Sequence, residues 1–148
     1  MFKPARILVP TDMSDDSDVA IRRAFDIAKT YDSEAFVLHV ITDPVKQCVA
    51  DYCLSDEIAA EIHSRMLETA RSQVWGQLAK FASMGVSPVN VDLRIGVPHD
   101  EILKDAEERD ADLIVIATFG KTGLGKNFMG SVARHVLSGA KCSVLLVK

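Results

Sequence analysis

The sequence lacks a long uninterrupted apolar run, and it therefore lacks the signature of a membrane-spanning helix. No stretch reaches the roughly 20 consecutive apolar residues that an α-helix needs to cross the hydrocarbon core of a bilayer. The N-terminal segment also meets Asp12 too early for the apolar region of a secretory signal peptide. We therefore expect a cytoplasmic protein with no membrane partner.

Cysteines are few, and basic residues are slightly outnumbered, with 17 Lys and Arg against 21 Asp and Glu. The three cysteines, Cys48, Cys53 and Cys142, are an odd number without the spacing of a disulfide framework or of a zinc site. They favour reduced, unpaired thiols, with a redox role for Cys48 and Cys53 as the alternative. The formal net charge of −4 argues against a general nucleic-acid-binding protein. We predict no nucleic-acid partner and no metal site built from side chains alone.

What the chain does contain is a regular alternation of short apolar runs with segments of helical periodicity. Its 148 residues match the size of one domain, which we place at 1–148. The helical segments start after capping residues or at a proline. The longest of them is expected to end near Gly85. The predicted strands are 5–10, 34–41, 87–95, 112–117 and 143–148, and the predicted helices are 15–31, 55 to about 85, 98 to about 109 and 131–138.

This alternation predicts an α/β fold with a parallel sheet, because each crossover helix returns the chain to the same edge. Five strands are too few for an eight-stranded barrel. Most of the runs are apolar throughout, which is typical of strands covered on both faces. We therefore favour an open, doubly wound, five-stranded parallel sheet of order 3-2-1-4-5 with helices on both faces, although strand order is not visible in the residues themselves.

The glycine-rich segment after the fourth predicted strand approaches a phosphate-binding P-loop without matching one. Asn127 stands where a P-loop needs a hydroxyl residue to hold Mg²⁺, and the next helix begins only at about Ser131. A different anion site fits better. Gly120 allows a close backbone approach, while Gly130 and Ser131 open a helix whose first amides, from Val132 onward, point at a ligand. Ser131 is also expected to cap that helix, and a capped helix after a simple connecting loop is the alternative interpretation.

Asp12 follows the first predicted strand at the start of the first helix. In open α/β sheets, ligands bind beyond the carboxyl ends of the strands at the point where the strand order reverses. With order 3-2-1-4-5 this point lies between the first and fourth strands, so Asp12 and the glycine segment would face one crevice. The carboxylate would then accept hydrogen bonds from a ribose or an adenine amino group. A turn or helix-capping role for Asp12 is the alternative.

Asp12 after the first predicted strand and the glycine-rich segment after the fourth, in this order, resemble the nucleotide-binding branch of the universal stress protein family. The resemblance covers the whole chain and rests on the pattern G-x-x-G-x(9)-G-[S/T]. Ala117, Gly120, Gly130 and Ser131 occupy its named positions, with Ala117 in place of the first glycine. The resemblance also supports the strand order 3-2-1-4-5.

The resemblance implies that the chain binds ATP, with ADP and AMP as further candidates, and that Mg²⁺ or Mn²⁺ would arrive with the phosphates. It implies a homodimer formed through the last strand, Ser143 to Lys148. An apolar strand left unpaired at a sheet edge is consistent with such a dimer. The implied ligand contacts are Asp12 with ribose or base, Val40 with adenine through its backbone, Ala117 at the first glycine position, and Gly120, Gly130, Ser131 and Val132 with phosphates.

The sequence shows no catalytic constellation, and we predict no catalytic residue. Ser131 and His135 are one helical turn apart, but the serine is better used at the helix start. His99 is a candidate for the crevice, whereas His39 is expected to be a buried, hydrogen-bonded core residue. We therefore expect a stress-response or signalling module with slow or no hydrolysis. The alternatives are a small ATPase or nucleotidyl-transferring enzyme, and an interaction domain that has lost nucleotide binding.

Overall fold

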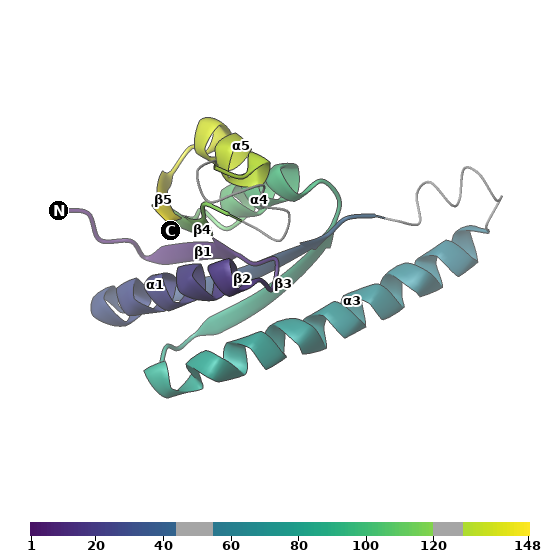
Figure 1. Ribbon diagram of the computed structural model, residues 1–148, viewed down its shortest axis with the longest axis horizontal. Helices are drawn as coiled ribbons and strands as arrows, with labels where there is room; N and C mark the ends of the chain where they lie inside the picture. Colours follow the sequence, from purple (N-terminus) through teal and green to yellow (C-terminus); the bar gives the residue numbers. More distant parts are fainter. Residues whose placement is uncertain (44–54, 120–128) are drawn as a thin grey trace.

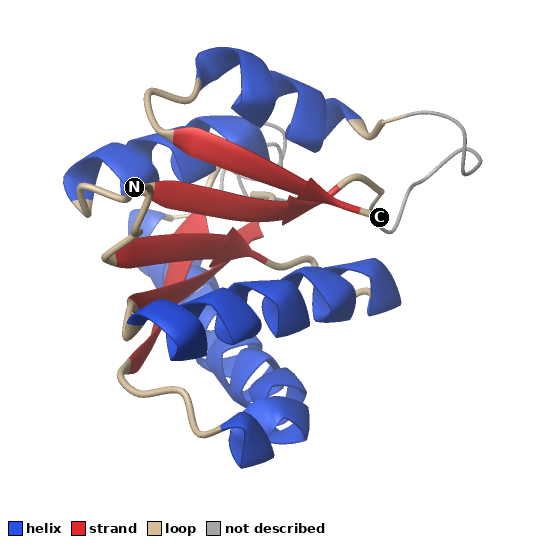
Figure 2. Ribbon diagram, turned by 90° about the vertical axis from the view of Figure 1, so that its left-hand side faces the viewer, coloured by secondary structure: helices blue, strands red, loops and turns tan. Residues whose placement is uncertain are grey.

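The computed structural model describes residues 1–43, 55–119 and 129–148. The described strands form one parallel five-stranded sheet of order β3-β2-β1-β4-β5, which confirms the predicted order (Figure 2). Each strand lies within two residues of the range predicted for it. The strands are β1 (Arg6–Pro10), β2 (Glu34–Ile41), β3 (Val89–Ile95), β4 (Leu113–Ala117) and β5 (Ser143–Val147).

Local sequence signals set the starts of the helices. The side chains of Ser14 and Ser55 cap two of them by accepting hydrogen bonds from backbone amides of the first turn. Pro98 occupies the first turn of a third helix, where its missing N–H costs nothing. The helices are α1 (Asp15–Tyr31), α3 (Asp56–Leu78), α4 (Pro98–Glu108) and α5 (Ser131–Gly139), with a 3₁₀ helix η1 (Ala79–Met84) continuing α3.

The helices cover both faces of the sheet, as a doubly wound fold requires (Figure 1). Successive residues of a strand point to opposite faces, so Ile7 and Val9 pack under α1 and α3 while Leu8 packs under α4 and α5. All three are fully buried. This two-sided burial explains why β1 is apolar at every one of these positions rather than at alternate ones.

The longest helix, α3, extends beyond the sheet at its N-terminal end (Figure 1). Its C-terminal part is anchored by the buried Val74, Gln77 and Leu78, whereas Ile58 near its start is 47% exposed. Gly85 ends the segment in the left-handed region at φ 66°, as its position predicts. Within the described ranges, no helix is long and apolar enough to cross a membrane.

Candidate functional site

The strand order creates one switch point, between β1 and β4. The two strands pair in parallel, with Ile7 opposite Leu113 and Leu8 opposite Ile114, so their carboxyl ends meet at the same edge. The chain leaves β1 into α1 on one face, and it leaves β4 toward α5 on the other face. This divergence is the arrangement that opens a ligand crevice in α/β sheets.

The segment after β1 forms a tight, hydrogen-bonded turn. Asp12 is half-buried, and one of its carboxylate oxygens accepts hydrogen bonds from the backbone amide and the hydroxyl of Ser14. Met13 adopts a left-handed backbone conformation at φ 63°, which is uncommon for a residue other than glycine. Ser14 in turn caps α1. Asp12 thus lies at the predicted edge and also has the turn-forming role considered as its alternative.

Val40 lies beside this turn. The β1–β2 register places Pro10 opposite Leu38, so Val40 is two residues beyond the paired position, as Asp12 is beyond Pro10. Val40 also pairs with Arg94 of β3, and its side chain packs on the α4–α5 side of the sheet. The backbone near Val40 is therefore level with the Asp12 turn.

The start of α5 is not built as the sequence predicts. Gly130, rather than Ser131, is the N-cap residue, at φ −60° and ψ 153°, and it provides no side-chain hydrogen bond to the first turn. Ser131 is the first helical residue, and it is exposed. The predicted serine cap is wrong because the chain enters the helix one residue earlier than assumed. The consequence strengthens the anion site, since among the described residues no side chain at the N-cap occupies the amides of the first turn.

Gly130 also holds the start of α5 against the end of β4. Its amide donates to the carbonyl of Thr118 over 2.7 Å, and a Cβ built on Gly130 would lie 3.3 Å from that oxygen. Thr118 is itself fixed, because its amide and its hydroxyl both donate to the carbonyl of Val147, over 2.8 and 2.7 Å. The amides of α5 therefore begin directly beside the end of β4.

Ala117 and Gly120 complete the predicted set. Ala117 ends β4 in register with Val147 and is half-buried. Positive φ angles among described residues other than glycine occur at Met13, Asp32 and Asp110, so Ala117 adopts a conformation that needs no glycine. Val132 follows Ser131 in the first turn of α5 and is half-buried. Gly120, Asn127, Cys48 and Cys53 lie outside the described residues.

The histidines divide between the two faces of the sheet. His99 at the start of α4 stacks on His135 of α5, with ring centroids 4.2 Å apart. The Nδ1 atom of His135 lies 2.7 Å from the carbonyl of Ser131, so this ring lies along the first turn of α5. His39 is half-buried, which corrects its predicted full burial, and its Nδ1 lies 2.8 Å from the carbonyl of Thr11. The predicted hydrogen bond of His39 is confirmed.

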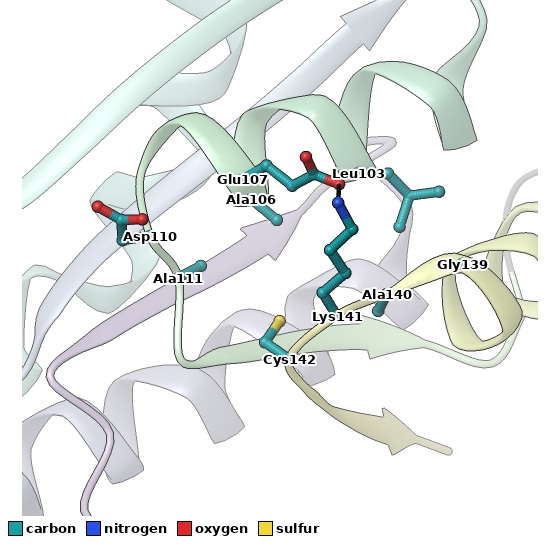
Figure 3. Close-up of a pocket in the computed structure, with 9 residues that line it drawn as sticks. All are labelled: Leu103, Ala106, Glu107, Asp110, Ala111, Gly139, Ala140, Lys141 and Cys142. Carbon is teal, nitrogen blue, oxygen red and sulfur yellow. Dashed lines mark ion pairs between the residues drawn. The ribbon is translucent and has the colours of Figure 1, made fainter.

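A separate cavity of about 310 Å³ lies at the opposite, amino edge of the sheet, between the ends of α4 and α5 (Figure 3). An ion pair of 3.0 Å joins Glu107 and Lys141 at this cavity. Burial raises the pKa of the Cys142 thiol above its usual value, which makes it a poorer nucleophile. None of the predicted nucleotide contacts lines this cavity.

The described residues contain no group of three or more His, Cys, Asp or Glu side chains that could hold a metal ion.

The sequence did not reveal the residues that fix the Asp12 turn, above all Thr11 and Gln77. Thr11 could have been identified from its position, because it is the one residue between the end of β1 and Asp12. Gln77 gave no signal, because a glutamine on a long helix is ordinarily a surface residue.

The comparison with known proteins decides the family. The model of the universal stress protein family matches residues 4–148. This chain belongs to the universal stress protein family. A curated relative, universal stress protein MJ0531 of Methanocaldococcus jannaschii, is 37% identical over 143 residues, which cover 97% of this chain and 81% of the relative.

Solved structures of the family share the fold. The structure of protein MJ0577, also from Methanocaldococcus jannaschii, is 28% identical with a TM-score of 0.81, covering 99% of this chain and 97% of that one. A universal stress protein in complex with cAMP is 22% identical (TM-score 0.65, covering 99% of this chain and 98% of that one). One from Archaeoglobus fulgidus in complex with dAMP is 24% identical (TM-score 0.56, covering 99% and 100%). At these identities the two complexes establish a shared fold.

Proposed function

We propose that residues 1–148 form one domain that binds an adenine nucleotide, with ATP as the first candidate and ADP or AMP as the others, in the crevice between β1 and β4. The observation that carries this proposal is the meeting of two complementary features at one edge of the sheet. The N-cap Gly130 places no side chain over the α5 amides, which suit phosphates, and the Asp12 carboxylate beyond β1 suits the hydroxyl or amino groups of a nucleoside. The cAMP and dAMP held by two proteins of the same fold support it.

The proposed contacts follow from where each residue lies. Asp12 accepts hydrogen bonds from the ribose or the base, and the backbone of Val40, level with it, meets the adenine ring. The amides of Ser131 and Val132 face the phosphates from the head of α5. Ala117 and Gly130 supply the close backbone approach at the end of β4 and the start of the helix, and the sequence pattern alone assigns Gly120, outside the described residues, to the phosphates.

We further propose that the module is cytoplasmic and acts as a homodimer in stress response or signalling. The sheet order leaves β5 at an edge, and three of its apolar residues, Val144, Leu145 and Leu146, are only half-buried. A second copy pairing along Ser143–Lys148 would cover this edge. Sedimentation velocity tests the dimer directly: the wild type should sediment as a dimer, and Val144→Lys should shift it toward the monomer.

Hydrolysis is expected to be slow or absent, since none of the described residues of the proposed site is placed as a base that activates water. Any Mg²⁺ or Mn²⁺ would be held chiefly by the phosphates. A small ATPase or nucleotidyl-transferring enzyme is the second candidate, favoured only if turnover exceeds about one per second and is lost on Asp12→Asn. An interaction domain without nucleotide affinity is the third, and restored binding on Ala117→Gly would identify it.

The test is native mass spectrometry of the purified protein, followed by calorimetry with ATP, ADP and AMP. We expect a co-purified or titratable adenine nucleotide, and a saturating ligand at 100 times its Kd should stabilise the fold by about 2.7 kcal/mol. Asp12→Ala should weaken binding, while the matched control Asp16→Ala, at an exposed position of α1, should not. The absence of heat and of a thermal shift at millimolar ATP would contradict the proposal.

A further inference from the structure

The main chain of Thr11 is held by β2 through both of its polar groups. Its amide donates to the carbonyl of Leu38 over 2.8 Å, which continues the ladder by one bond beyond the last paired residue of β1. Its carbonyl lies 2.8 Å from Nδ1 of His39. A carbonyl only accepts, so the Nδ1 atom of His39 carries the hydrogen in this contact. The residue immediately before Asp12 is therefore fixed on one side by a histidine side chain.

The side chain of Thr11 is held from the other direction, by α3. Its hydroxyl donates to Oε1 of Gln77 over 2.8 Å and accepts from the amide of Met13 over 3.0 Å. The Nε2 group of Gln77 donates to Oδ1 of Asp18 over 2.7 Å, so both ends of the amide are engaged. Thr11 and Gln77 are only 5% and 6% exposed, which makes each of these bonds expensive to lose.

These bonds bear on Asp12 because the turn that carries it is strained. The left-handed Met13 persists only if its surroundings hold it, and its amide is held by the Thr11 hydroxyl. The carboxylate of Asp12 is oriented within the same turn, where it accepts from the amide of Ser14 over 3.0 Å. A shift of Thr11 would move this carboxylate by a similar distance, and hydrogen bonds tolerate only a few tenths of an ångström.

We propose that His39 and Gln77 are positioning residues for the nucleoside half of the site, through which β2 and α3 fix where Asp12 meets the ribose or base. The inference rests on the proposed nucleotide binding, and it predicts an effect confined to one half of the ligand. The head of α5, held by Thr118 and Gly130, shares none of these bonds. Phosphate contacts should therefore not depend on His39 or Gln77.

The experiment measures the Kd of adenosine and of inorganic tripolyphosphate separately, by calorimetry, for the wild type and three variants. His39→Leu and Gln77→Leu should weaken adenosine binding on the order of tenfold while leaving the Kd of tripolyphosphate unchanged. His39→Asn is the matched control, because its side-chain amide nitrogen can replace Nδ1 as the donor to Thr11. It should restore most of the adenosine affinity that His39→Leu loses.

A double-variant cycle separates positioning from general damage. In an Asp12→Ala background, His39→Leu should cause no further loss of adenosine affinity, because the group it positions is gone. Amide hydrogen exchange on the nucleotide-free protein gives an independent readout. The Met13 amide should exchange faster in Gln77→Leu, and His39→Leu carries the test if Gln77→Leu fails to fold.

Each outcome has a defined meaning. Unchanged adenosine affinity in His39→Leu, equal losses for adenosine and tripolyphosphate, or additive losses with Asp12→Ala would overturn the positioning inference while leaving nucleotide binding intact. A wild-type protein that binds neither ATP nor adenosine would overturn the proposed function together with this inference. Selective loss of adenosine affinity with recovery in His39→Asn would support both.

Discussion

Two buried polar clusters lie on opposite faces of the sheet, and they are built from different chemistry. The cluster under α1 and α3 is centred on three neutral side chains, Thr11, Ser17 and Gln77, each less than 10% exposed. The Thr11 hydroxyl donates to Oε1 of Gln77 over 2.8 Å and lies 2.9 Å from the hydroxyl oxygen of Ser17. This cluster adjoins the candidate site, because Thr11 directly precedes Asp12.

The cluster under α4 is ionic. Asp105 is fully buried and lies 2.9 Å from a guanidinium nitrogen of Arg94. Arg109 extends the cluster through an ion pair of 2.6 Å with Asp92, and its guanidinium also lies 5.0 Å above the ring of Phe36. The cluster joins α4 to β3, an edge strand that β2 separates from β1.

The difference shows what each kind of bond is suited to. Neutral hydrogen bonds are directional and have little long-range field, so they fix the Asp12 turn without biasing the charge of a nearby ligand. Ion pairs act at longer range and depend on pH. Here they attach α4 to β3, which is the edge strand at the opposite end of the sheet from β5. We therefore expect stability to depend most on the ionic cluster and ligand affinity to depend most on the neutral one.

The largest predicted effect on stability is that of Arg94→Met. This variant leaves the buried Asp105 with Arg109 alone, whose Nε lies 3.8 Å away. Removing one partner of a buried ion pair should lower the free energy of unfolding by about 3 kcal/mol, measured by urea denaturation. The matched control is Arg65→Met, which breaks an exposed pair of 2.8 Å with Glu61 and should change stability by less than about 1 kcal/mol.

The double variant Arg94→Met with Asp105→Leu sharpens this result. Replacing both charges by apolar groups should recover most of the loss, because the penalty comes from the uncompensated carboxylate. If the double variant instead loses the sum of what Arg94→Met and Asp105→Leu each lose alone, the ionic cluster stabilises the fold through packing. The contrast between the ionic and the neutral cluster then disappears.

The next effect is that of Thr11→Val, which removes the hydroxyl at the centre of the neutral cluster at almost constant volume. It leaves Oε1 of Gln77 and the amide of Met13 without the partner they now have, and the expected loss is about 1–2 kcal/mol in urea denaturation. Thr11→Ser keeps the hydroxyl and should lose less than half as much. Equal losses in the two variants would attribute the effect to the methyl group and contradict the role of the hydroxyl.

Sequence patterns predict the architecture of this protein well, because the elements are fixed by local and periodic signals. The apolar residues of β1, the Ser14 cap and Gly85 at the end of η1 each act within a few residues of the element they define. The strand order follows from the family resemblance and is confirmed. The error at the start of α5 was local: glycine and serine are both acceptable caps, and the choice between Gly130 and Ser131 depends on how closely β4 approaches.

The polar clusters could not be predicted in the same way, since they join residues far apart in the chain. Thr11 and Gln77 are separated by 66 positions, and their hydrogen bond depends on how α3 lies across the sheet. Arg94 and Asp105 are closer in sequence, but their pairing requires the burial that only the packed fold provides. The candidate site was found from its backbone signals, whereas the residues that position it needed tertiary structure.

The smallest effects are pH-dependent and distinguish two carboxylates within the ionic cluster. Burial raises the pKa of Asp105, with the charge of Asp92 acting in the same direction, whereas the hydrogen bond from Arg94 lowers the pKa of Glu108. For Asp105, the folded state binds the proton more tightly than the unfolded state, so its contribution to stability falls as pH rises above the ordinary aspartate pKa of 3.8. For Glu108, the contribution is present above the ordinary glutamate pKa of 4.5 and is lost as pH falls through the lowered value.

The variants Asp105→Asn and Glu108→Gln should therefore show opposite pH trends relative to the wild type in urea denaturation. The stability of the wild type minus that of Asp105→Asn should decrease as pH rises above 3.8, because only the wild type must ionise a buried carboxyl. The stability of the wild type minus that of Glu108→Gln should decrease as pH falls below 4.5. Parallel trends in the two variants would mean that the buried and the exposed carboxylate share one environment. The ionic cluster would then behave as a surface network, and the burial of Asp105 could not be the reason that Arg94→Met costs more than Thr11→Val.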